Sequence, residues 1–173
     1  MPRTLTPKRK KTNIQGTVAA KVWLMARNTN DGHTCADIAG EVGYTSTKVK
    51  QYLHKKFEAE ANGIWSKLIR SRVEGRCEIC NGPPCEVHHL VEKSVWPQHR
   101  YNLVNGVALC SGHHQFNVLL SPHATTTSAV AFLDWLSRNK PLQFEWYKIA
   151  RATKTYGDID HEHHYWLLLD IGS

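Results

Sequence analysis

The sequence has no apolar run long enough to cross a membrane, which takes about 18 residues. Its first residues, MPRTLTPKRKKTN, are basic, but no apolar segment follows them as it would in a secretory signal. The five cysteines are an odd number, which argues against a disulfide framework and leaves metal ligation or buried thiols. We therefore expect a soluble, cytoplasmic protein that binds no membrane.

Acidic residues are scarce in the first half of the chain. Residues 1–76 hold 15 Lys and Arg against 6 Asp and Glu, whereas residues 77–173 hold 7 against 9. Such an asymmetry favours a polyanionic partner, most often nucleic acid, over a surface that is merely basic and solvated. A length of 173 residues suits one medium domain or two small ones.

Residues 1–13 are expected to form a flexible basic arm. Lys8, Arg9, Lys10 and Lys11 have no acidic residue near them in the sequence. Basic blocks of this kind contact the phosphate backbone of DNA, although a solvated tail without a role is the alternative.

Residues 14–57 are predicted to form a helix-turn-helix domain. A first helix is expected over Gln15–Asn28, and Thr34 can cap a second helix with Ile38, Ala39 and Val42 on its inner face. Gly43 suits the turn, because a Cβ is disfavoured at positive φ. Thr45 or Ser46 can then cap a third helix with Val49, Tyr52 and Leu53 turned inward.

The stretch Cys35–His54 resembles the helix-turn-helix of bacterial regulators. The resemblance implies that the helix after Gly43 is a recognition helix. The residues that would then face DNA are Thr45, Ser46, Thr47, Lys48, Lys50 and Gln51. An ordinary helical hairpin is the alternative. Residues 58–76 are expected to hold a basic connecting helix from about Ile64 to Glu74.

Two short ligand pairs predict a zinc site. Cys77 and Cys80 form C-x-x-C, and Cys110 and His113 form C-x-x-H about thirty residues later. Three sulfurs and one imidazole nitrogen suit tetrahedral structural zinc. Cys85 follows two prolines, which makes it a poor partner for either pair.

Two histidine pairs lie in the same region, in the segments EVHHLVEKS and NGVALCSGHH. Residues 77–117 resemble the HNH nuclease family, whose ββα-metal fold places a hairpin before a helix. The resemblance implies that His88 and His114 bind a divalent ion such as Mg²⁺ or Mn²⁺, with Asn117 as a candidate third ligand. His89 resembles the general base of the family, and because adjacent side chains in a strand point to opposite faces, it can serve apart from the ion that His88 would bind.

The same resemblance gives two further residues a role. Asn105, preferred over Asn102, would hold the loop between the strands and so orient His89. Arg100 could grip a phosphate. A zinc ribbon without catalysis would explain the cysteines and His113, but not the register of the remaining histidines with Asn105.

The last third of the sequence predicts helices over TTTSAVAFLDWLSRN and from Pro141 onward. Trp135, Trp146 and Tyr147 are expected in the core. The segment DIDHEHHYWLLLD is expected to form a polar turn before an apolar strand, in preference to a further metal site.

Together these patterns predict a mainly helical α+β protein. A helix-turn-helix precedes a zinc-stabilised HNH nuclease domain at 77–173 that carries a helical C-terminal extension. We expect a divalent-metal-dependent endonuclease that is nicking or site-directed on duplex DNA, or that cuts both strands as a homodimer. The resemblance suggests a bacteriophage or mobile-element protein that could act with another phage protein. A zinc-containing DNA-binding regulator and a recombination or packaging accessory protein that acts on branched DNA are the alternatives.

Overall fold

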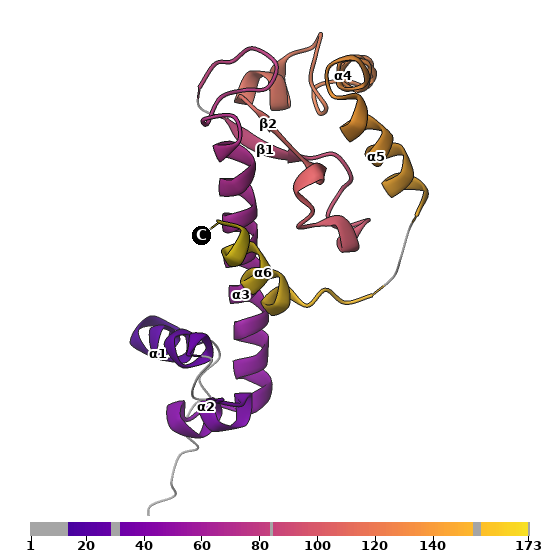
Figure 1. Ribbon diagram of the computed structural model, residues 1–173. Coiled ribbons are helices and arrows are strands. Elements are labelled where there is room, and N and C mark those ends of the chain that lie inside the picture. The colour runs from indigo at the N-terminus through magenta and orange to yellow at the C-terminus, as the bar shows by residue number, and fades with distance from the viewer. Residues whose placement is uncertain (1–13, 29–31, 84, 154–156, 173) are drawn as a thin grey trace, which may run out of the picture. The chain divides into compact units, whose positions relative to one another are not determined.

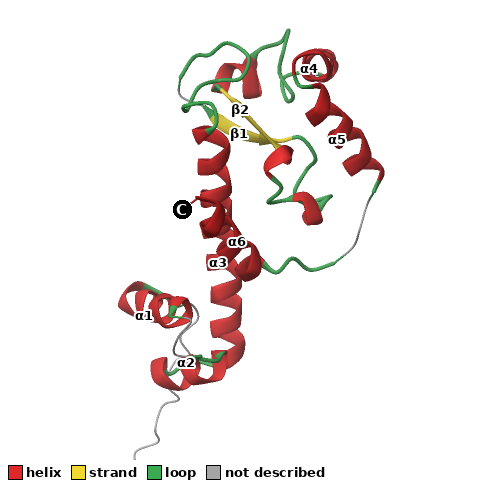
Figure 2. Ribbon diagram, in the orientation of Figure 1, coloured by secondary structure: helices red, strands yellow, loops and turns green. Residues whose placement is uncertain are grey.

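The computed structural model describes residues 14–28, 32–83, 85–153 and 157–172 (Figure 1). Within these residues the chain is mainly helical with one two-stranded antiparallel sheet, which confirms the α+β class (Figure 2). The chain divides into two compact units, Met1–Ala59 and Glu60–Ser173. The predicted arm with Lys8, Arg9, Lys10 and Lys11 lies outside the described residues. In the described part, no helix has both the length and the apolar character that a membrane span requires.

The first unit contains α1 (Gly16–Arg27), α2 (Cys35–Val42) and the beginning of α3 (Ser46–Ser71). Thr34 caps α2 as predicted: its hydroxyl accepts the Asp37 N–H at 3.2 Å, and the Asp37 carboxylate accepts the Thr34 N–H at 2.8 Å. Gly43 ends α2 at φ 69°, a left-handed conformation that reverses the chain direction at little cost for a residue without Cβ.

The core of this unit is built from the positions that the sequence pattern assigned to it. The buried side chains include Ile38 and Ala39 of α2 and Val49 and Leu53 of α3. Tyr52 is half-buried, and its hydroxyl donates to the Ala19 carbonyl of α1 at 3.2 Å. The three helix segments therefore close around one small apolar centre.

The helix α3 is continuous from Ser46 to Ser71, where the sequence analysis expected two separate helices. The reason is a buried stripe at a spacing of four residues that no proline interrupts. A single Gly63 costs only about 1 kcal/mol in a helix interior. The stripe consists of Val49, Leu53, Phe57, Ala61, Trp65 and Ile69.

The second unit is built on β1 (Glu86–His89) and β2 (Gly106–Leu109), which pair antiparallel with His89 opposite Gly106. All four residues of β2 are buried. The two predicted helices form: α4 (Thr126–Asn139) is capped by Thr125, and α5 (Pro141–Ala152) begins at Pro141 as expected. Tyr147 is buried in this core, and Trp135 and Trp146 pack against it, which confirms the three aromatic core positions.

The C-terminal segment forms the helix α6 (His161–Gly172), so the expected apolar strand is wrong. His161, Tyr165 and Leu168 are buried at helical spacing, and Asp160 caps the helix by accepting the His163 N–H at 2.9 Å. The continuous run WLLLD concealed this period, since a short apolar run does not separate helix from strand.

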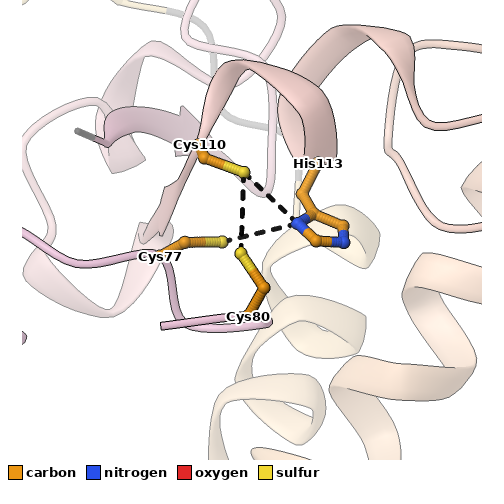
Figure 3. Close-up of side chains that lie close together, drawn as sticks. All are labelled: Cys77, Cys80, Cys110 and His113. Atoms are coloured by element: carbon orange, nitrogen blue, oxygen red, sulfur yellow. Dashed lines mark hydrogen bonds between the residues drawn. The ribbon is translucent and has the colours of Figure 1, made fainter. Parts of the chain in front are cut away.

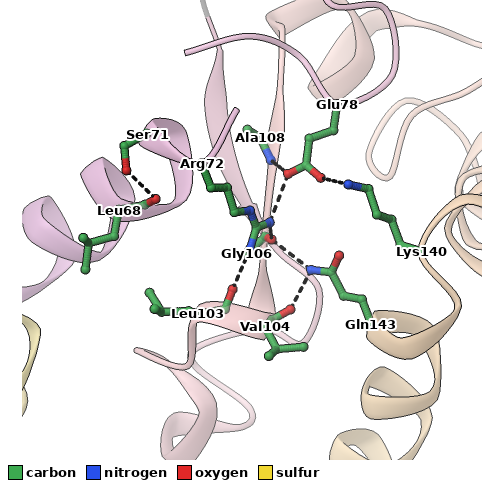
Figure 4. A network of polar contacts seen from close by, with 10 residues as sticks. All are labelled: Leu68, Ser71, Arg72, Glu78, Leu103, Val104, Gly106, Ala108, Lys140 and Gln143. Atoms are coloured by element: carbon green, nitrogen blue, oxygen red, sulfur yellow. Dashed lines mark hydrogen bonds and ion pairs between the residues drawn. The ribbon is translucent and has the colours of Figure 1, made fainter. Parts of the chain in front are cut away.

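A buried carboxylate joins three parts of the second unit (Figure 4). Glu78 accepts the Ala108 N–H at 2.9 Å and lies 3.0 Å from Arg72 Nη2 and 2.9 Å from Lys140 Nζ. Burial disfavours its charge, but the Ala108 N–H, Lys140 and Arg72 outweigh burial and hold the Glu78 pKa below its usual value. The end of α3, strand β2 and the α4–α5 junction are therefore tied together.

Carbonyl groups before and within β2 extend this network. Arg72 also donates to the carbonyl of Leu103 at 3.1 Å and to that of Gly106. Gln143 of α5 donates to the Gly106 carbonyl at 2.9 Å and to the Val104 carbonyl. Side chains thereby bond carbonyl groups at the edge of the two-stranded sheet, as the backbone of a third strand would otherwise do.

We expect Glu78→Gln to lower the free energy of unfolding by about 2 kcal/mol, because it leaves Arg72 and Lys140 without their counter-charge. Glu145→Gln is the matched control, since the Glu145–Lys148 pair is exposed at both ends and should be worth less than about 1 kcal/mol. Urea unfolding at constant zinc measures both. Equal losses in the two variants would contradict a structural role for the buried network.

Candidate metal centres

The first centre brings together the four predicted zinc ligands (Figure 3). Cys77 and Cys80 lie in the loop after α3, Cys110 directly follows β2, and His113 lies on the π-helical turn Gly112–Phe116. Cys80 Sγ lies 3.8 Å from Cys110 Sγ, and His113 Nδ1 lies 3.3 Å from Cys110 Sγ and 3.7 Å from Cys77 Sγ. The four side chains point toward one common centre.

These distances fit a tetrahedral zinc ion. Zn–S bonds of about 2.3 Å and Zn–N bonds of about 2.0 Å place neighbouring sulfurs about 3.8 Å apart, and sulfur and nitrogen about 3.5 Å apart. Burial opposes ionisation of Cys77, but backbone hydrogen bonds from Cys80, Cys110 and Ile79 hold the pKa of its thiol below the usual value. The cluster can therefore hold a metal such as zinc. Cys85 is buried outside it, as predicted.

The second centre consists of His88 on β1, His114 on the π-helical turn and His123 in the loop before α4. Their candidate ligand nitrogens lie within 4.8 Å of one another, and His88 Nδ1 is 3.1 Å from His123 Nε2. Two nitrogens bound to one ion at about 2.1 Å are about 3.0–3.4 Å apart. The sequence analysis paired His88 with His114 and missed His123, which lies in irregular backbone beyond the resemblance.

Two side chains fix the second centre from outside. Glu86 Oε2 lies 2.7 Å from His114 Nδ1, and because a carboxylate accepts, that nitrogen carries the proton and Nε2 is left to ligate. Ser121 is fully buried and donates to the His114 carbonyl at 2.8 Å, while it accepts the His123 N–H at 3.2 Å. The loop between the two histidines is thereby clamped at its base.

Asn117, the predicted third ligand, uses its side-chain oxygen to bond the backbone of the loop that follows it. Asn117 Oδ1 accepts the Leu119 N–H at 2.9 Å and the Leu120 N–H at 3.1 Å. His123 is the residue that lies with His88 and His114.

Burial lowers the pKa of two of the three histidines in the second centre. It lowers the His88 pKa to about 3, with further lowering from the neighbouring His123, His114 and His89. Burial and His114 also lower the pKa of His123. The His88 ring is therefore neutral near pH 7, which is the form that binds metals.

His89 has a separate environment, as strand alternation predicts. Its ring stacks on Trp65 of α3 with centroids 4.0 Å apart and planes 15° apart, and its Nε2 lies 3.0 Å from the Arg100 carbonyl. Because a carbonyl only accepts, Nε2 carries the proton and Nδ1 keeps its lone pair. Burial lowers the His89 pKa to about 4, so the ring is unprotonated at neutral pH.

Asn105 anchors the loop between the strands. It is fully buried, and its Oδ1 accepts the Val91 N–H at 2.8 Å while its Nδ2 donates to the His99 carbonyl at 3.0 Å. Asn102 is exposed, and its carbonyl accepts the Trp65 indole N–H at 3.0 Å. The asparagine that was expected to hold the loop is thus the one with buried, bidentate contacts.

Gly106 follows Asn105 for a steric reason. A Cβ at this position would lie 2.7 Å from the Ile69 side chain and 2.9 Å from the Trp65 ring. Its absence lets α3 approach β2 closely and brings Trp65 over His89.

A cavity of about 180 Å³ adjoins the second centre. It is lined by His88, His89 and His123 together with apolar side chains that include Leu90, Phe132 and Tyr147. Glu92 also lines it, so the wall combines imidazole rings, one carboxylate and apolar side chains.

The predicted DNA-facing residues lie at two places. Thr45, Ser46, Thr47, Lys50 and Gln51 are exposed at the start of α3, and Lys48 is half-buried. Arg100 is half-buried in the second unit, where its Nε lies 3.4 Å from Asn62 Oδ1 and its guanidinium stands over the Tyr101 ring.

The chain matches no known protein-family model, and comparisons with curated proteins and with solved structures found no match.

We expect Cys80→Ser to abolish stoichiometric zinc binding at the first centre, because a hydroxyl is a far weaker zinc ligand than a thiolate. Cys35→Ser, on α2 in the first unit, is the matched control and should keep its zinc. Inductively coupled plasma mass spectrometry of dialysed protein measures both. Full zinc in Cys80→Ser would contradict the assignment.

His123→Ala should weaken binding of a second divalent ion by about tenfold or more and leave the first centre filled. Isothermal titration of the zinc-loaded protein with Ni²⁺ measures the change. His163→Ala, on the exposed side of α6, is the control. An unchanged titration in His123→Ala would exclude this residue as a ligand.

Proposed function

We propose that this protein is a divalent-metal-dependent DNA endonuclease of the HNH type. The observation that carries the proposal is that the adjacent histidines of β1, His88 and His89, lie in different environments. His88 joins His114 and His123 at a metal centre, whereas His89 turns away and is held as a neutral, singly protonated ring. Two adjacent histidines with only a structural role would not need separate environments.

The order of elements supports the same proposal. An antiparallel pair of strands leads into a helical turn, and two of the three candidate ligands, His88 and His114, come from the first strand and from that turn. This is the ββα order that the resemblance in the sequence implies.

The donor set favours a transition-metal ion over Mg²⁺. The cluster offers three imidazole nitrogens, which suit Zn²⁺, Ni²⁺ or Fe²⁺, whereas Mg²⁺ prefers carboxylate and water oxygens. When bound, such an ion supplies positive charge that stabilises the phosphate in the transition state and the departing 3′ oxygen. The protein residues that hold it are His88, His114 and His123.

His89 performs the proton transfer in this mechanism. Its Nδ1 takes a proton from water as the water oxygen attacks phosphorus and the P–O3′ bond breaks. The departing 3′ oxygen takes a proton from solvent, so that a 5′ phosphate and a 3′ hydroxyl remain. The Arg100 carbonyl fixes the tautomer of His89, the Trp65 ring fixes its plane, and Asn105 anchors the loop that carries Arg100.

The first unit supplies the proposed DNA-binding surface. Its sequence carries most of the excess of positive charge, and α3 exposes a row of small hydroxyl, amide and lysine side chains from Thr45 to Gln51. Hydroxyl and amide groups can contact base edges in the major groove, and lysines can contact phosphates. We therefore propose duplex DNA as the partner.

Supercoiled plasmid incubated with Ni²⁺, Mn²⁺ or Mg²⁺ tests the proposal. We expect wild-type protein to convert it to nicked or linear DNA, and His89→Ala to be about 10²- to 10⁴-fold slower while it keeps its metal content. His163→Ala should cut at the wild-type rate. Binding without cleavage by wild-type protein with every ion would favour a DNA-binding regulator. Cleavage unaffected by His89→Ala would refute the mechanism.

A further inference from the structure

The segment between two ligands of the second centre presents three large apolar side chains to solvent. Phe116 is 71% exposed, Val118 63% and Leu119 79%. Apolar groups gathered on an ordered surface mark a site of interaction more often than isolated ones do. The sequence from Lys93 to Leu133 also contains no aspartate or glutamate, so no acidic side chain of this stretch opposes an anionic partner.

The backbone of this segment is held in place although its side chains are exposed. Asn117 donates its N–H to the Gly112 carbonyl at 2.7 Å and accepts the Leu119 and Leu120 N–H groups with its side chain. Buried Ser121 closes the other end by its contacts with the backbone of His114 and His123. The apolar side chains are therefore displayed by a fixed scaffold.

Chain geometry places the backbone of this segment beside the second centre. Consecutive Cα atoms are about 3.8 Å apart, so the Cα atom of Phe116 lies within about 7.6 Å of that of His114. Under the proposed function the cleaved phosphate lies at this centre, and base pairs along DNA are about 3.4 Å apart. Under that function, DNA bound at this centre therefore passes within a few base steps of Phe116.

We infer that Phe116, Val118 and Leu119 form an apolar wedge that inserts between bases next to the cleaved phosphate. The inference rests on the proposed nuclease function and specifies its substrate. The faces of bases are apolar and stack on aromatic rings, whereas a phosphate backbone alone would select basic side chains. Inserted apolar side chains unstack a base step and kink the duplex. The preferred substrate is therefore duplex DNA that unstacks readily, at a mismatch, a bulge or a flexible pyrimidine–purine step.

The test uses a short duplex that spans a cleavage site mapped on plasmid DNA, with 2-aminopurine placed in turn at each position near the cut. His89→Ala protein loaded with Ni²⁺ is added, and the fluorescence of 2-aminopurine rises where a base loses its stacking neighbour. We expect a rise within three base steps of the cut. Adding Phe116→Ala and Leu119→Ala to the His89→Ala protein should remove the rise and weaken binding by about five- to a hundredfold.

Two controls isolate the wedge. Leu142→Ala removes a side chain that is 87% exposed on α5 and should leave both signals unchanged. Phe116→Trp keeps a flat apolar ring and should retain the fluorescence rise. Equal content of both metals in all variants shows that the two centres are intact.

The outcomes separate this inference from the proposed function. If wild-type protein cuts plasmid but the double substitution changes neither fluorescence nor affinity, the wedge is refuted and the nuclease stands. If wild-type protein neither binds nor cuts DNA, both are refuted. If sedimentation shows a dimer that the double substitution dissociates while the DNA signals are unchanged, the segment contacts a second copy of the chain, and the wedge is again refuted.

Discussion

The constraint on which the second unit depends is the helical turn Gly112–Phe116, where neighbouring histidines face different centres. Successive side chains on a helix diverge by about 100°, so His113 and His114 cannot serve one ion together. The π-helical hydrogen bond from the Asn117 N–H to the Gly112 carbonyl widens this turn. One peptide bond thus joins a ligand of the cysteine cluster to a ligand of the histidine cluster. The position of His114 therefore depends directly on how firmly His113 is held.

The sheet alone could not hold these positions. Two strands of four residues are marginal in water, and a hairpin of this size needs other contacts to persist. The fold supplies three of them: the cluster around Cys77 and Cys110, the buried Glu78 network, and Asn105 bridging Val91 and His99. Each is a polar or metal-ligating contact, and they add to the apolar core that Val107 and Leu109 of β2 share with α4 and α5. The same contacts fix β1, which carries both His88 and His89.

Features encoded by neighbouring residues could be predicted from the sequence, and features that depend on distant contacts could not. The Thr34 cap, the Gly43 turn, the two ligand pairs and the opposite faces of His88 and His89 all follow from local stereochemistry. His123 reaches its neighbours only through the loop clamped by Ser121, and nothing in its local sequence marks it. The continuity of α3 and the helical state of α6 could not be predicted. Both depend on stripes of buried residues, and which residues are buried is known only once the elements that pack on them are known.

The arrangement of ligands implies that the two centres are thermodynamically linked. An ion bound at the cysteine cluster restricts the turn that carries His114 before a second ion arrives, so the conformational entropy of ordering that turn is lost only once. Glu86 and Ser121 restrict the same residue from its other side. Linkage is reciprocal, so an ion held by His88, His114 and His123 must in turn raise the affinity of the first centre, to which His113 belongs, for its own ion. A zinc site of this kind contributes to ligand geometry at its neighbour as well as to the stability of the fold.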